Sequence, residues 1–130
     1  GIPIVNPLSN PDCTGYIFTR GWAVYWDGFH NGLDLAKYGG CPIRAIASGT
    51  VISAGWNYWG GGYTVVIDHG TGLVSQYLHG ETIWVSAGEY VSAGQEIMYM
   101  GTTGNSTGVH LHLTLKIDNV AIDPTTYVPY

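Results

Sequence analysis

The chain has 130 residues, of which 10% are charged, and 9 acidic against 4 basic side chains give a formal net charge of −5. So few basic residues exclude the clustered positive surface that nucleic acid requires, and they are equally unsuited to anionic lipid headgroups. Hydrophobic residues make up 45% of the chain, so a packed core is expected and disorder is not. We expect one domain over residues 1–130, of which residues 1–15 form an irregular N-terminal extension.

The N-terminal thirty residues are interrupted by prolines and rich in aromatic side chains, with two short strands expected at Tyr16–Thr19 and Trp22–Trp26. After residue 40, glycine-rich turns separate short runs of branched and aromatic residues, which is typical of β-strands. These expected strands are Ile43–Ala47, Gly49–Gly55, Tyr63–His69, Leu73–His79, Thr82–Val85, Glu96–Met100, Val109–Lys116 and Val120–Ile122. No segment of helical length has a helical period. The pattern therefore predicts a mainly β fold with an antiparallel, sandwich-like or barrel core and long aromatic-rich loops.

Two cysteines, Cys13 and Cys41, are too few for a zinc ribbon and do not form a C-x-x-C motif. One disulfide between them would suit an extracellular protein, but the sequence alone leaves the pairing open. No apolar run reaches the roughly 20 residues that span a bilayer. Because the chain begins at Gly1 without a signal peptide, we expect a mature domain or an excised piece of a longer protein.

Side chains able to do chemistry gather in two places. In the strand Val109–Lys116, His110 and His112 point to the same face, about 7 Å apart along the strand, because side chains on a strand alternate. Upstream, His30 and Asp34 are four residues apart, a spacing that shares a face on a helix and also on a strand. Two imidazoles on one face indicate either a metal site or a proton-transfer pair.

Ligands from both places would complete a three-ligand site, since a nitrogen of His30, an oxygen of Asp34 and one imidazole of the 110–112 pair are available. Three protein ligands with a fourth open position are typical of catalytic zinc, which lowers the pKa of its bound water to about 7. The residues alone do not decide whether His110 or His112 binds the metal. The remaining imidazole and His79 would then accept the proton of that water, donate one to a leaving amine, or stabilise an oxyanion.

Three segments carry a family resemblance: H-N-G-L-D (His30–Asp34), Y-L-H (Tyr77–His79) and G-N-S-T-G-V-H-L-H (Gly104–His112). Further matching pieces are A-S-G-T-V (Ala47–Val51), V-S-A-G-E-Y-V-S-A-G-Q (Val85–Gln95) and I-D-P (Ile122–Pro124). In this order and spacing, over residues 16–127, the chain resembles the lysostaphin/LytM-type family of zinc endopeptidases that cut peptidoglycan peptides.

The resemblance implies one zinc ion on His30, Asp34 and His112, and catalytic roles for His79 and His110. It also implies a compact antiparallel β core with a cleft across one sheet. The chain departs from the family at Cys41, where a small polar residue is expected, so the family does not supply a disulfide there.

We therefore expect a zinc metalloendopeptidase that hydrolyses peptide cross-links or stem peptides of peptidoglycan. It would be extracellular, at the cell wall or on a virion, and either a monomer or one domain of a larger chain. The alternatives are a non-catalytic wall-binding or regulatory module of the same fold, and a structural component of a phage tail. All five site residues are present, which speaks against a module that has lost its metal. The bond cut, Gly-Gly or D-amino-acid, stays open, as does the identity of the general base.

Overall fold

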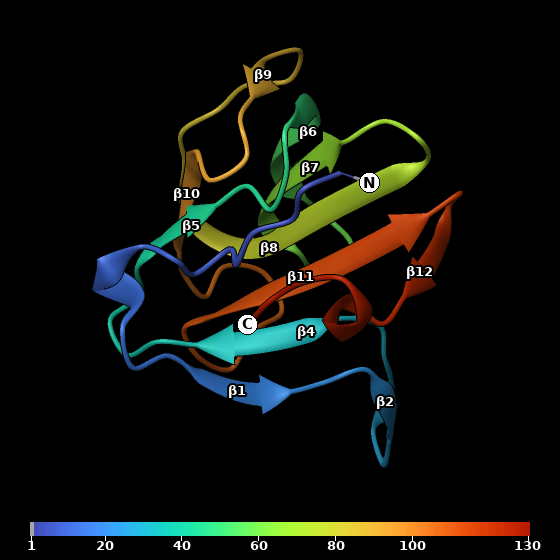
Figure 1. The fold of residues 1–130 in the computed structure, drawn as a ribbon. Coiled ribbons are helices and arrows are strands. Elements are labelled where there is room, and N and C mark those ends of the chain that lie inside the picture. The colour runs from blue at the N-terminus through green and yellow to red at the C-terminus, as the bar shows by residue number, and fades with distance from the viewer. Residues whose placement is uncertain (1) are drawn as a thin grey trace.

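The computed structural model describes residues 2–130 and consists almost entirely of short antiparallel strands (Figure 1). The strands are β1 (Ile17–Arg20), β2 (Ala23–Tyr25), β3 (Gly28–His30), β4 (Leu33–Ala36), β5 (Pro42–Arg44), β6 (Gly49–Asn57), β7 (Gly62–Asp68), β8 (Leu73–Ile83), β9 (Tyr90–Val91), β10 (Glu96–Met100), β11 (His110–Ile117) and β12 (Val120–Ile122). Two single-turn 3₁₀ helices, η1 (Pro11–Cys13) and η2 (Pro124–Thr126), complete the described residues. The expectation of a mainly β, antiparallel fold is confirmed. No helix within residues 2–130 is long and apolar enough to cross a bilayer.

Ten of the strands form one sheet, whose main path runs β1-β4-β11-β8-β7-β6-β9. Strand β10 pairs with β8 and with β5, while β12 pairs with β11. Figure 1 shows β4, β11 and β8 side by side across the middle of the molecule, with the β2–β3 hairpin projecting beyond the end of β1. This hairpin is a separate two-stranded sheet.

The expected strand Leu73–His79 and the first half of the expected strand Thr82–Val85 are in fact one strand, β8, which ends at Ile83, so the prediction of a break was wrong. At the position of the predicted break the strand is irregular but continuous. His79 has φ 67°, and the pairing register with β10 shifts between Thr82 and Gly80. A side chain on Gly80 would lie 2.4 Å from Met98 Cε and 3.2 Å from the Tyr63 carbonyl oxygen, so Met98 would have to move to accommodate it. The distortion separates the half of β8 that pairs with β7 and β11 from the half that pairs with β10, and it places His79 at the bend.

Strand β4 was not expected, because its four residues lie between turn-rich segments. Its alternation is nevertheless clear: Leu33 and Leu35 are fully buried, while Asp34 points to the opposite face. On the neighbouring β11, Leu111, Leu113 and Leu115 are fully buried in the same way. Burial of each such leucine contributes about 1.5–3 kcal/mol, so the core fixes which face of β4 and β11 carries the polar residues.

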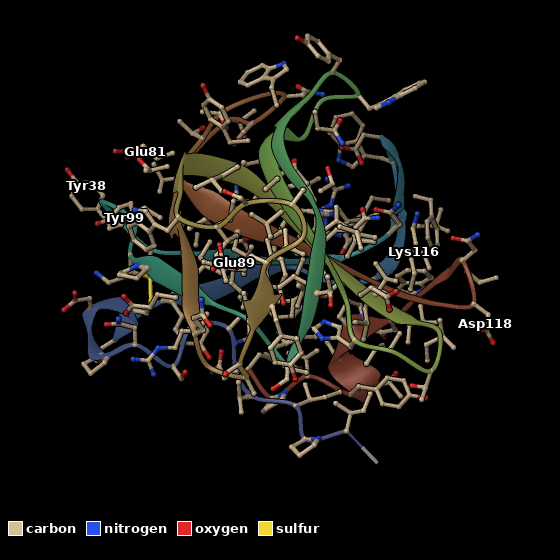
Figure 2. The ribbon with its side chains drawn as sticks, turned by 90° about the horizontal axis from the view of Figure 1, so that it is seen from above. Tyr38, Glu81, Glu89, Tyr99, Lys116 and Asp118 are labelled. Carbon is tan, nitrogen blue, oxygen red and sulfur yellow. A yellow bond between two sulfur atoms is a disulfide. The ribbon has the colours of Figure 1, made fainter. Side chains whose placement is uncertain are left out.

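Cys13 and Cys41 form a disulfide that joins η1 to the segment before β5, with Cα atoms 5.3 Å apart (yellow bond in Figure 2). The pairing that the sequence left open is therefore present. Both cysteines are fully buried. By closing a loop of 28 residues, the disulfide lowers the entropy of the unfolded chain and adds about 3.5 kcal/mol to the free energy of unfolding. It also links the N-terminal segment covalently to the sheet.

Candidate metal and catalytic centre

Three side chains from three strands converge on the polar face of β4 and β11. Asp34 lies opposite His112 in the β4–β11 register, and His30 is the last residue of β3. Asp34 Oδ2 is 3.0 Å from His30 Nε2, and Asp34 Oδ1 is 2.9 Å from His112 Nδ1. One ligand atom from each of these residues lies within 4.8 Å of the other two, so the three residues are brought together as expected.

Hydrogen bonds on the far side of each ring assign which nitrogen faces the centre. His30 Nδ1 is 3.0 Å from the Gly21 carbonyl oxygen, to which it donates, so Nε2 carries a lone pair. That Nε2 atom is buried and has no hydrogen-bond partner, although Asp34 Oδ2 lies 3.0 Å away. Two electron-rich atoms this close repel unless a cation lies beside both, which is the environment that metal ligands create. The donor set of two imidazoles and a carboxylate without thiolates fits zinc in an open, catalytic site.

His112 is oriented by Thr114, two residues further along β11. Its Nε2 is 2.9 Å from Thr114 Oγ1, and the Thr114 side chain is buried. If Nε2 donates to this hydroxyl, Nδ1 presents its lone pair toward Asp34. Sequence reasoning missed Thr114, although the alternation of β11 places it on the same face as His112.

Asp34 is ionised at neutral pH. Burial raises the pKa of its carboxyl group, but the adjacent imidazoles of His112, His30 and His110 outweigh burial and lower it. The centre therefore contains one fixed negative charge among imidazoles.

His79 and His110 form the second pair, with ring centroids 4.8 Å apart. His79 Nδ1 donates to the Thr103 carbonyl at 2.8 Å, and His110 Nδ1 donates to the Gly108 carbonyl at 2.8 Å. Both Nε2 atoms are therefore left to carry a lone pair, and that of His110 lies 3.8 Å from Asp34 Oδ1. Burial lowers the pKa of His79, which keeps this ring neutral and able to accept a proton at neutral pH.

The glycine run 60–62 positions the loop that orients His79. The His79 N–H donates to the Gly61 carbonyl at 2.7 Å, and the Asn105 N–H donates to the Gly60 carbonyl at 2.8 Å. A side chain on Gly62, whose φ is 66°, would lie 2.5 Å from Thr103. The run is thus more than a plain hairpin turn, because only glycine lets the β6–β7 tip approach the 101–109 loop this closely.

A cavity of about 300 Å³ opens beside the centre, next to Asp34 and His110. Its other lining residues are Thr19, Arg20, Ala36, Thr107, Gly108 and Val109. Arg20 was not expected at the site, since nothing in the sequence places β1 next to β4. His69, by contrast, lies outside the centre and bonds to the Ser48 carbonyl and to Ser75 Oγ, as expected for a histidine in a turn.

Residues 28–124, which include all five site residues, match the family model described as peptidase family M23. The chain belongs to peptidase family M23. Lysostaphin of Staphylococcus simulans is 37% identical over 106 residues, which are 78% of this chain but only 22% of lysostaphin. The structure of the lysostaphin catalytic domain superposes with a TM-score of 0.82 at 33% identity, covering 88% of this chain and 93% of that domain.

A second similar structure is described as a zinc containing peptidase from Vibrio cholerae. It has a TM-score of 0.81 at 30% identity and covers 91% of this chain and 37% of its own. A chain of the SpoIIQ–SpoIIIAH pore forming complex has a TM-score of 0.81 at 23% identity, covering 98% of this chain and 91% of its own, and shows the fold alone. The M23 chain thus spans about a fifth of lysostaphin, and its division into an extension and one domain stays a prediction.

Proposed function

We propose that this M23 chain is a zinc-dependent endopeptidase that hydrolyses peptides of bacterial peptidoglycan. The observation that carries the proposal is the buried His30 Nε2 atom, which has no hydrogen-bond partner and lies 3.0 Å from Asp34 Oδ2. His30, Asp34 and His112 would hold the ion. Zinc in such a site supplies a Lewis acid and lowers the pKa of bound water to about 7.

The proton transfers fall to His79 and His110 in this proposal. Both rings are fixed through Nδ1 by backbone carbonyls, so Nε2 is the atom that accepts a proton from the attacking water. The same atom, once protonated, donates to the leaving amine or to the oxygen of the tetrahedral intermediate. Which ring acts first as the base stays open. Asp34 remains a carboxylate throughout, because its pKa is lowered.

The location of the enzyme is a further part of the proposal. A buried disulfide suits an oxidising compartment, and peptidoglycan lies outside the membrane, so we place the protein at the cell wall. Attachment to a virion is the alternative location, and both Gly-Gly bridges and D-amino-acid stem bonds are candidate substrates.

The test is digestion of purified peptidoglycan of known cross-linking, with mass analysis of the fragments. The zinc-loaded protein should release peptide fragments, and a chelator should stop it. The variant His110→Ala should lose turnover while it still binds zinc, whereas His69→Gln, which changes a histidine outside the centre, should remain active. Release that persists after zinc removal, or full activity of His110→Ala, would contradict the proposal.

A second candidate is a wall-binding module without hydrolysis. It is favoured by the aromatic tips of two hairpins, because Trp26 and Trp59 are 96% and 97% exposed and free to stack on wall polymers. The same digestion separates the two functions. If the zinc-loaded protein sediments with peptidoglycan but releases no fragment, the binding module replaces the enzyme.

A further inference from the structure

The cavity beside the centre contains one basic side chain, Arg20, and no other arginine or lysine lines it. Arg20 is the last residue of β1 and lies directly opposite Asp34 in the antiparallel β1–β4 register. Directly opposed residues have Cβ atoms about 5 Å apart on the same face. Arg20 is therefore an immediate neighbour of the candidate metal ligand, in a chain that has only four basic residues.

The Arg20 guanidinium is held in place from the β2–β3 hairpin. Its carbon lies 4.1 Å from the centre of the Tyr25 ring, and one terminal nitrogen bonds Asp27 Oδ1. Tyr25 is itself fixed, because its hydroxyl donates to the Gly21 carbonyl at 3.2 Å. A stacked and ion-paired guanidinium keeps one orientation, which lowers the entropy cost of binding a ligand.

Most of the donors of Arg20 remain available. A guanidinium has five N–H groups, and within residues 2–130 the only hydrogen bond of the Arg20 side chain is the one to Asp27. None of its other nitrogens is a buried atom without a partner, so they face solvent or the cavity. A planar fork of this kind matches a carboxylate, which it binds through two parallel hydrogen bonds.

We propose that Arg20 anchors a carboxylate of the substrate beside the scissile bond, so that the cleft prefers stem peptides with a free carboxylate over uncharged glycine bridges. The inference rests on the proposed function and deepens it. Because Arg20 and Asp34 are cross-strand neighbours and a residue of extended peptide spans about 3.3 Å, the carboxylate would be one or two residues from the bond that is cut.

Binding affinity tests the inference without requiring turnover. The probes are the stem peptide L-alanyl-D-γ-glutamyl-L-lysyl-D-alanine with its carboxylates free, and the same peptide with both carboxylates converted to carboxamides. Titration is done with zinc-loaded protein in a His79→Asn background, so that bound peptide is not consumed. Asparagine tolerates the positive φ at this position, and His79 does not line the cavity.

We expect the free-carboxylate peptide to bind roughly 10- to 100-fold more tightly than the amidated one. Arg20→Gln should remove this difference and leave the affinity for the amidated peptide unchanged, while Arg20→Lys should keep part of it. Arg44→Gln is the matched control, because Arg44 lies on β5 and does not line the cavity. The Arg44→Gln variant should prefer the free-carboxylate peptide over the amidated peptide by the same factor as the parent.

Equal affinities of the parent for the two peptides would overturn the inference, as would a preference that survives Arg20→Gln. Equal weakening of both peptides by Arg20→Gln would also overturn it, because that is the effect of a merely structural arginine. The proposed function fails separately: a carboxylate preference that depends on Arg20, combined with no digestion of peptidoglycan, leaves the subsite standing and removes the peptidase.

Discussion

Replacing Thr114 with valine tests whether the hydroxyl on β11 sets the metal affinity of the centre. Valine keeps the branched shape that suits a strand but removes the Oγ1 atom that lies 2.9 Å from His112 Nε2. Without that partner, His112 is free to carry its proton on Nδ1 and donate it to Asp34, 2.9 Å away. The lone pair that the metal needs is then lost, although every proposed ligand is still present.

The expected loss is about 10- to 100-fold in zinc affinity, the usual cost of removing a partner that orients a metal-bound histidine. This corresponds to about 1.4–2.8 kcal/mol. In zinc well above both dissociation constants, the stabilisation that zinc gives to the folded protein should fall by the same amount. The metal-free variant should lose only about 1 kcal/mol, the worth of one hydrogen bond.

Competition with a chromogenic chelator measures the affinity, and urea unfolding with and without zinc measures the stabilisation. Thr114→Ser should restore the parent affinity because it keeps the hydroxyl. Thr64→Val is the matched control, since Thr64 is also buried and bonded through Oγ1, in this case to the Gly62 carbonyl. If Thr114→Val binds zinc as tightly as the parent, Thr114 does not orient His112.

Three further predictions concern the scaffold. Gly32→Ala should destabilise the protein by about 1–3 kcal/mol in urea unfolding, because its Cβ would lie 2.5 Å from His112 Nε2 and 2.6 Å from the Leu113 oxygen. Gly108→Ala, with no atom within 4 Å, should cost much less, and equal losses would refute the packing argument. Removing the Cys13–Cys41 disulfide by serine substitution should lower the free energy of unfolding by about 3.5 kcal/mol, and an unchanged urea midpoint would contradict this. Burial lowers the pKa of His69 below the 6.5 of an unfolded histidine, so its neutral form stabilises the fold above pH 6.5 and this contribution is lost as the pH falls toward the folded pKa. In His69→Gln the free energy of unfolding, measured in urea, should fall less between pH 7.5 and pH 5 than it does in the parent. An identical fall in both proteins would contradict the role given to His69.

The strand pattern of β11 could be predicted from the sequence because its alternation is local. His110, His112 and Thr114 share a face whatever the rest of the chain does. The choice between His110 and His112 could not be made from the residues, because it depends on the register between β11 and a strand 78 residues away. In that register Asp34 lies opposite His112, and His110 lies opposite Ala36.

The segment around His30 and Asp34 was the other source of ambiguity. A spacing of four fits a helix face or a strand face, yet the structure uses neither. His30 ends β3 and Asp34 lies in β4, and residues 31 and 32 turn between the two strands. The close approach of Gly32 to His112 makes this turn possible, and such a contact between distant segments is invisible in the sequence. The disulfide was undecidable for the same reason, since only the fold brings Cys13 and Cys41 within 5.3 Å.

The way in which the four imidazoles are oriented has a consequence for the charge of the proposed centre. The outer nitrogens of His30, His79 and His110 donate to backbone carbonyls, and that of His112 bonds a hydroxyl. Within residues 2–130, Asp34 is the only carboxylate in ionic contact with any of these rings. Because the outer partners of the two ligand imidazoles, His30 and His112, are a carbonyl and a hydroxyl and not carboxylates, a divalent ion held by His30, Asp34 and His112 would keep a net charge of about +1. The centre would thus remain electrophilic toward a peptide carbonyl.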